Sequence, residues 1–158
     1  LDTATSMLIR ASLPLSATGN LLDLGCGAGP IALTMARRSP AAHIWAVDVN
    51  RRAREVCARN AHRNGLINIT TVHPDDVPAD LSFATIWSNP PIRIGKTALH
   101  ELPEQWLGRL DTDGNASLVV QKHLGADSLQ RWLIELGYRC ERVGSKAGYR
   151  LFTVRSDR

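Results

Sequence analysis

Short apolar runs of strand length recur along the chain and alternate with segments of helical composition. These runs are LLDLG, HIWAVDV, ITTVH, FATIWSN and ASLVVQK. Strands that are apolar on both faces are typical of a parallel sheet that is covered by helices on either side. The alternation therefore predicts an α/β fold built on a mostly parallel sheet.

Helices are predicted between the strands from their stop signals. Proline cannot continue a helix, and glycine is favoured just after the last turn, where the backbone becomes left-handed. Pro14, Ser39-Pro40, Gly65 and Gly137 supply such stops. The predicted helices span Thr5–Leu13, Ile31–Arg38, Arg51–Asn64, His100–Leu110 and Ala126–Leu136. The fourth of these helices is expected to begin or to be interrupted near Pro103.

The last third of the chain predicts a different arrangement. Asp113-Gly114 is expected to form a turn into the strand SLVVQ. Arg139–Gly144 and Tyr149–Val154 are joined by the short segment SKAG, which predicts a closing antiparallel hairpin. With 158 residues, 44% of them hydrophobic, and no linker-like stretch, the chain is expected to form a single domain over residues 1–158.

The glycine-rich run DLGCGAGP, from Asp23 to Pro30, follows the first predicted strand, Leu21–Leu24. Glycines at alternate positions let the backbone turn tightly and approach a ligand, with the amino end of a helix just beyond. Asp48 ends the second strand, where a carboxylate can accept hydrogen bonds from both hydroxyls of a ribose. Together they predict a nucleotide-cofactor site. A dinucleotide dehydrogenase would have the motif G-x-G-x-x-G, whose third glycine is replaced here by Pro30 or Ala32, depending on where the count begins. This alternative is therefore weakened but stays open. A simple strand-to-helix turn without a ligand is a further alternative.

The run is similar to the D-x-G-x-G-x-G signature of class I S-adenosylmethionine methyltransferases. This resemblance implies S-adenosylmethionine as the cofactor, with Asp23 near its amino group and an acid after the third strand near adenine. Asp75 and Asp76 both lie there, and the sequence neither chooses between them nor excludes that both are solvated turn residues. The residues implied in cofactor binding are Asp23, Gly25, Cys26, Gly27, Gly29, Asp48, Val49, Asp75, Asp76 and Asn89.

A second candidate site is the segment Ser88-Asn89-Pro90-Pro91-Ile92, at the end of the fourth predicted strand. Ligands of open α/β sheets bind at this carboxyl edge. The lone pair of a conjugated amine is delocalised, so methyl transfer to it requires acceptors that hold both N–H groups. The Asn89 side-chain oxygen and the Pro90 carbonyl can serve as these acceptors, and the prolines stiffen the turn. An ordinary turn is the alternative.

This turn resembles the N-P-P-aromatic motif of amino-methyltransferases, which act on base amines and glutamine amides; Ile92 stands in place of the aromatic residue. With NPPIRIGK, VVQKHLGADSLQRWL, KAGYRLFTV and the opening LD-x-A-T-x-x-L-I, nearly the whole chain resembles the small-subunit ribosomal RNA guanine-N2 methyltransferases. That resemblance implies a Rossmann-like, doubly wound, seven-stranded mostly parallel sheet with a C-terminal antiparallel hairpin, and a ribosomal RNA guanine as substrate. The catalytic residues are then Asn89, Pro90, Pro91 and Ile92.

The charge of the chain also bears on the substrate. Its 19 lysines and arginines exceed its 15 acids for a formal net charge of +4, which favours an anionic partner such as RNA. Arg93 and Lys96 flank the Asn-Pro-Pro turn and are candidates for contacts with substrate phosphates. The arginines of the helix after Asp48 are expected on its solvated face. Glutamine-amide or DNA-adenine methylation, and a non-catalytic cofactor-binding RNA module, are the alternative functions.

Other classes of site find less support. Cys26, Cys57 and Cys140 lie singly, without metal-ligand spacing, so reduced core cysteines are expected and no metal. His100-Glu101 lacks the second histidine of a zinc-protease motif. No run approaches the roughly 18 to 20 apolar residues of a membrane span, and the first residues lack the layout of a signal peptide, so a cytoplasmic location is expected.

Overall fold

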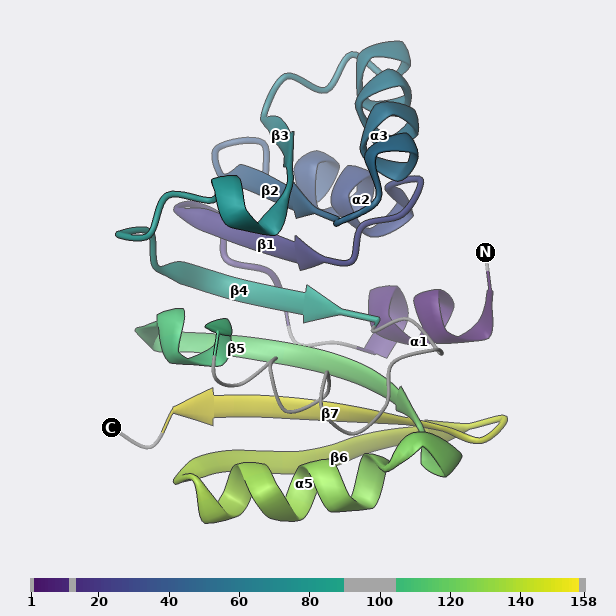
Figure 1. Ribbon diagram of the computed structural model, residues 1–158, viewed down its shortest axis with the longest axis vertical. Helices are drawn as coiled ribbons and strands as arrows, with labels where there is room; N and C mark the ends of the chain where they lie inside the picture. The colour runs from purple at the N-terminus through teal and green to yellow at the C-terminus, as the bar shows by residue number, and fades with distance from the viewer. Residues whose placement is uncertain (1, 12–13, 90–104, 157–158) are drawn as a thin grey trace.

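The computed structural model describes residues 2–11, 14–89 and 105–156. Its strands are β1 (Asn20–Leu24), β2 (His43–Val47), β3 (Ile69–Val72), β4 (Phe83–Ser88), β5 (Leu110–Gln121), β6 (Tyr138–Lys146) and β7 (Tyr149–Ser156). They form one seven-stranded sheet in the order β3-β2-β1-β4-β5-β7-β6 (Figure 1). β1 to β5 run parallel, whereas β7 is antiparallel to both β5 and β6. This topology confirms the predicted Rossmann-like, mostly parallel sheet with a C-terminal antiparallel hairpin.

Within the described residues, four helices connect or flank these strands, and each lies within two residues of its predicted bounds. Asn50 explains one boundary, because its side-chain oxygen caps the helix after β2 by accepting the N–H of Ala53 at 3.1 Å. None of the helices within the described ranges is long and apolar enough to cross a membrane. The helices are α1 (Thr3–Ala11), α2 (Pro30–Arg38), α3 (Arg51–Arg63) and α5 (Ala126–Glu135), with the 3₁₀ turns η1 (Pro74–Asp76), η2 (Leu107–Arg109) and η3 (Lys122–Leu124).

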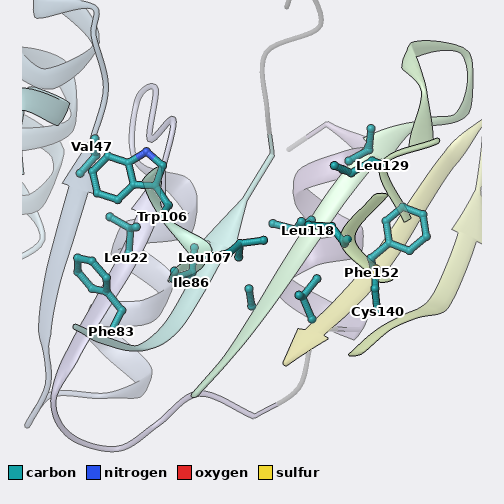
Figure 2. Packing of buried hydrophobic residues seen from close by; sticks show 14 of the residues in the cluster. Leu22, Val47, Phe83, Ile86, Trp106, Leu107, Leu118, Leu129, Cys140 and Phe152 are labelled. Carbon is teal, nitrogen blue, oxygen red and sulfur yellow. The ribbon is translucent and has the colours of Figure 1, made fainter. Parts of the chain in front are cut away.

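Helices cover both faces of the sheet. Because successive strand residues point to opposite faces, Leu21 and Ile44 lie in one core with α1, α2 and α3. Leu22, Ile86 and Phe152 lie in the other core, with η2 and α5 (Figure 2). The parallel strands are therefore held between two layers, and their carboxyl ends meet along one edge.

Asp113 and Gly114 lie inside β5, so the predicted turn before that strand is wrong. The pairing of β4 with β5 shifts register around these two residues, which form an irregular bulge. A Cβ on Gly114 would lie 2.9 Å from the carbonyl oxygen of Phe83. The same Cβ would lie 3.0 and 3.1 Å from the backbone oxygen and nitrogen of Asp111, so the glycine is required both by the irregular backbone of β5 and by the close approach of β4.

Two further boundaries differ from the prediction. The described end of the predicted helix His100–Leu110 is the 3₁₀ turn η2, and Leu110 already belongs to β5. The hairpin connection is shorter than SKAG, since Ala147 and Gly148 alone join β6 to β7. Their φ angles, 51° and 82°, are both positive, as in the two-residue turns whose twist matches that of antiparallel strands.

Candidate functional site

The carboxyl ends of β1 to β4 bring the predicted site segments to one edge of the sheet (Figure 1). The glycine-rich loop follows β1, Asp48 follows β2, η1 follows β3 and Asn89 follows β4. Parallel pairing is the cause, because all four strands end at the same side. Pro90, Pro91, Ile92, Arg93 and Lys96 lie outside the described residues.

The glycine-rich loop continues the hydrogen-bond ladder of β1 before it turns into α2. The N–H groups of Gly25 and Cys26 both donate to the carbonyl of Val47, at 2.7 and 2.9 Å. Gly25, Gly27 and Gly29 have φ angles of 81°, 53° and 96°. These left-handed conformations are strained for residues with a Cβ, which explains why glycine recurs at alternate positions.

Gly27 and Gly29 serve different purposes within the loop. A Cβ on Gly29 would lie 2.6 Å from the sulfur of Cys57 and 2.9 Å from Cδ1 of Leu33, so this glycine allows α3 to pack against the loop. A Cβ on Gly27 would meet nothing within 4 Å. The space beside Gly27 is therefore open for a ligand.

This difference predicts opposite behaviour of two matched variants. Gly29→Ala is expected to lower the free energy of unfolding by about 2–4 kcal/mol, because it combines overpacking with a left-handed backbone. Gly27→Ala is expected to lower the free energy of unfolding by only about 1–2 kcal/mol, through backbone strain. It should weaken cofactor binding by more than this loss of stability explains. Urea unfolding and calorimetric titration with S-adenosylmethionine measure the two effects. Equal losses of stability in both variants would contradict this assignment.

Asp48 orders the loop while remaining half-exposed. Its Oδ2 accepts the N–H of Gly27 at 3.0 Å, and its Oδ1 accepts the N–H of Asn50 at 2.9 Å. A carboxylate has about four acceptor positions, so two remain for the hydroxyls of a ribose. Val49, beside it, is 70% exposed, which offers an apolar surface at the same edge.

Asp48→Ala is expected to raise the dissociation constant for S-adenosylmethionine by about 10- to 100-fold, since hydrogen bonds to a charged group contribute roughly 1.5–3 kcal/mol. Asp48→Asn, which keeps one acceptor oxygen, should give an intermediate value. Asp80, an exposed acid before β4 at the opposite end of the sheet, supplies the control: Asp80→Ala should bind normally. Calorimetric titration measures all three, and equal affinities of the Asp48→Ala and Asp80→Ala variants would refute the ribose role.

Asp23 is completely buried in β1 beneath the loop. Burial raises the pKa of its carboxyl group to about 7; the backbone N–H of Ala32 offsets part of the rise, and the nearby charge of Asp48 adds to it. Apart from this amide, neither carboxylate oxygen has a hydrogen-bond partner among the described residues. A buried carboxylate without a partner is costly, and a cationic ligand group is the kind of partner that would satisfy it.

Helix α3 supports the site through residues that the sequence did not single out. Arg54 was expected on a solvated face, but its guanidinium donates to the backbone carbonyls of Asp48 and Val49 at 2.9 and 3.0 Å. The side chain of Asn60 donates to the carbonyl of Ala28, in the glycine-rich loop, at 3.0 Å. The remaining arginines of this helix are exposed, as predicted.

The two acids of η1 are both exposed at the end of β3. The ring nitrogen Nδ1 of His73 accepts the N–H of Asp75 at 3.1 Å and lies 3.6 Å from the carboxylate of the same residue. Because Nδ1 accepts this N–H through its lone pair, it carries no proton that it could donate to the Asp75 carboxylate. Both acids therefore stay candidates for a ligand contact at this edge.

Asn89 is fixed at the end of β4 by contacts on both sides. The hydroxyl of Ser88, the last residue of β4, donates to the carbonyl of Leu24 at 3.2 Å, directly before the glycine-rich loop. The Asn89 side-chain nitrogen donates to the hydroxyl of Thr5 in α1 at 3.4 Å. The sequence signal for Thr5 was present in LD-x-A-T-x-x-L-I, but it assigned no role to the hydroxyl.

The three cysteines are free and buried, which confirms them as core residues. A hydrogen bond with Cys57, together with burial, raises the pKa of the Cys26 thiol far above its usual range, and burial raises that of Cys140 to about 12. Cys26 and Cys140 are therefore inert thiols at neutral pH. No group of three or more potential metal ligands occurs in the described part of the chain.

Sheet topology separates two classes of nucleotide-binding protein. The dinucleotide-binding sheet has the order 3-2-1-4-5-6, whereas here an antiparallel strand is inserted between β5 and β6. This insertion, with the glycine-rich loop and the acids around it, identifies the chain as a class I S-adenosylmethionine-dependent methyltransferase. It belongs to the methyltransferase small domain family, which it matches over residues 1–153.

Relatives of known sequence or structure cover the chain to different extents. It is 36% identical over 151 residues to the uncharacterized protein YbxB of Bacillus subtilis, covering 94% of this chain and 75% of that protein. It is 36% identical over 130 residues to ribosomal RNA small subunit methyltransferase C of Aeromonas hydrophila, covering 78% of this chain but 37% of that enzyme. The 16S rRNA N2 methyltransferase of T. thermophilus, solved with AdoMet and guanosine, has the same fold: TM-score 0.81, 21% identity, covering 99% of this chain and 43% of that one.

Proposed function

We propose that this methyltransferase transfers a methyl group from S-adenosylmethionine to the exocyclic amine N2 of guanine in ribosomal RNA. The observation that carries the proposal is the position of Asn89, next to the glycine-rich loop through the Ser88–Leu24 hydrogen bond. The name of the Aeromonas hydrophila relative supports ribosomal RNA as the substrate. The net charge of +4 is consistent with a polyanionic partner.

Bound S-adenosylmethionine supplies a methyl group on a positively charged sulfur. The described residues suit this cofactor in several places. Asp48 would accept the ribose hydroxyls, and Val49 would lie against the adenine ring. The carboxylate of Asp23 would compensate the charge of the cofactor's ammonium group. The open space beside Gly27 would admit the part of the cofactor that links this ammonium group to the ribose. Gly25, Cys26 and Gly29 would shape the loop.

Asn89 would orient the acceptor amine. Its Nδ2 is occupied by Thr5, so its Oδ1 is the side-chain atom that remains to accept an amine N–H. The sequence assigns the second N–H to the carbonyl of Pro90. Held in this way, the nitrogen lone pair would be directed at the methyl carbon.

The reaction needs orientation more than it needs a base. The bound cofactor would supply the methyl carbon and keep the electron pair of the broken carbon–sulfur bond, so Asn89 would only have to hold the amine nitrogen in line for the new bond. The nitrogen then carries one proton too many and releases it to water. Proximity and hydrogen-bond acceptors fixed in advance therefore account for most of the expected rate enhancement.

The decisive experiment measures which nucleoside becomes methylated. Unmodified small-subunit ribosomal RNA, made by transcription in vitro, is incubated with the protein and S-adenosylmethionine carrying a labelled methyl group. The RNA is then digested and its nucleosides are separated by mass. Labelled N2-methylguanosine is expected, and a transcript in which inosine replaces guanosine should accept no label, because inosine lacks the exocyclic amine.

Parallel incubations with DNA and with a ribosomal protein fraction test the alternatives. Labelled N6-methyladenine in DNA, or labelled methylglutamine in protein, without labelled guanosine would replace the proposed substrate. Cofactor binding without methyl transfer to any of these acceptors would instead favour a non-catalytic RNA module.

A further inference from the structure

The side chain of Asn89 is held by a residue from the other end of the chain. Its Nδ2 donates to Oγ1 of Thr5 at 3.4 Å, across a sequence separation of 84 residues. Thr5 is 5% exposed and Asn89 is half-buried. The bond is thus partly shielded from water, which weakens competition from solvent.

Helix α1 presents the Thr5 hydroxyl from a rigid first turn. Asp2 accepts the N–H of Thr5 on its side-chain oxygen at 2.7 Å and the N–H of Ser6 on its backbone carbonyl at 3.0 Å. Ala4 and Leu8, at 2% and 0% exposure, anchor the same turn and the next in the core. The hydroxyl therefore has a defined position relative to the end of β4.

The orientation of the Asn89 amide decides what an amine would meet. An amide carries two N–H donors on one side and one acceptor oxygen on the other. If the group rotated by half a turn, its N–H groups would face the N–H groups of the amine, and donors repel donors. A hydroxyl can donate or accept, and here the Thr5 hydroxyl accepts from Nδ2, which leaves Oδ1 for the substrate.

We propose that Thr5 is a positioning residue for methyl transfer: its hydroxyl holds the Asn89 amide with Oδ1 toward the acceptor amine. This inference rests on the proposed role of Asn89. It assigns a purpose to the buried hydroxyl of α1, which the cofactor contacts do not explain.

Thr5→Val tests the proposal because it removes the hydroxyl and keeps the branched shape. At saturating cofactor we expect kcat to fall about 3- to 10-fold, the loss typical of one hydrogen bond, with KM for RNA and cofactor affinity unchanged. Thr5→Ser, which restores the hydroxyl, should recover most of the rate. Thr3→Val replaces an exposed threonine on the same helix and should have no effect.

A second measurement follows the contact without any reaction. The two Nδ2 proton signals of Asn89, assigned by their loss in Asn89→Ala, are expected to shift in Thr5→Val and to return in Thr5→Ser. Full activity of Thr5→Val, or unchanged Asn89 signals, would overturn the proposal, as would a parallel loss of kcat and thermal stability that serine does not rescue. If the wild-type protein methylates no guanine, the proposed substrate fails, while the amide signals still decide the contact and the kinetic comparison moves to the amine that is methylated.

Discussion

Replacing Asn89 by alanine is expected to lower kcat for RNA methylation by about two to three orders of magnitude, the range seen when one fixed polar group is removed from a transition-state site. The physical reason is that the amine would lose the acceptor that directs its lone pair at the methyl carbon. Single-turnover methylation at saturating S-adenosylmethionine measures the chemical step separately from cofactor binding.

Asn64→Ala is a suitable control, because Asn64 is an exposed residue at the end of α3 whose side chain contacts Arg37 and the carbonyl of Asn60. It should retain the wild-type rate. An Asn89→Ala protein whose kcat stays within twofold of wild type would exclude the role that we propose for this amide.

The stability of the cofactor-free protein is expected to depend on pH through Asp23. An unfolded chain ionises this carboxyl near its ordinary pKa of 3.8, whereas the folded protein keeps it protonated up to about pH 7. The folded state thus binds more protons between these values, so the free energy of unfolding falls as the pH rises from about 4 to about 7. A difference of this size corresponds to about 4 kcal/mol.

Asp23→Asn isolates this contribution from other titrating groups. The variant should be similar in stability to the wild type near pH 4 and more stable than it near pH 8, as measured by urea unfolding without cofactor. A stability difference that does not change with pH would show that Asp23 titrates normally.

The same variant should bind S-adenosylmethionine more weakly, because the ionised Asp23 is the proposed partner of the cofactor's ammonium group. For the wild type, the dissociation constant should rise as the pH falls below 7, approaching a tenfold rise per pH unit once the carboxyl is protonated. Asp23→Asn should show little such dependence. Calorimetric titration from pH 5.5 to 8.5 measures both dissociation constants. Tight binding by Asp23→Asn at every pH would show that Asp23 is not the partner of the ammonium group.

Sequence reasoning succeeded where the structural cause is local. The strands are recognisable because they are short and apolar, and the end of α3 because Gly65 follows it. The glycine-rich loop is recognisable because a left-handed turn between a strand and a helix demands glycine. Each of these requirements acts within a few residues.

It failed where packing outside the predicted element supplies the reason. Gly114 looks like a turn residue, and a Cβ there would meet the nearby backbone of Asp111, but it would also lie 2.9 Å from the carbonyl oxygen of Phe83 in β4. Arg54 looks like part of a solvated face, yet it donates to the carbonyls of Asp48 and Val49, just before α3 begins. The pairing with β4 and the direction of the Arg54 side chain are not visible in the pattern of apolar and polar residues.

The sequence by itself determined the class of fold and the place of the glycine-rich loop, since composition and spacing encode backbone conformation directly. Only the tertiary structure decided that Asp23 is buried with no side-chain partner among the described residues and that Nδ2 of Asn89 donates to the hydroxyl of Thr5. Burial and long-range hydrogen bonds arise when parallel strands and packed helices bring residues together that lie tens of positions apart. The chemistry of the site therefore depends on contacts that no single segment contains.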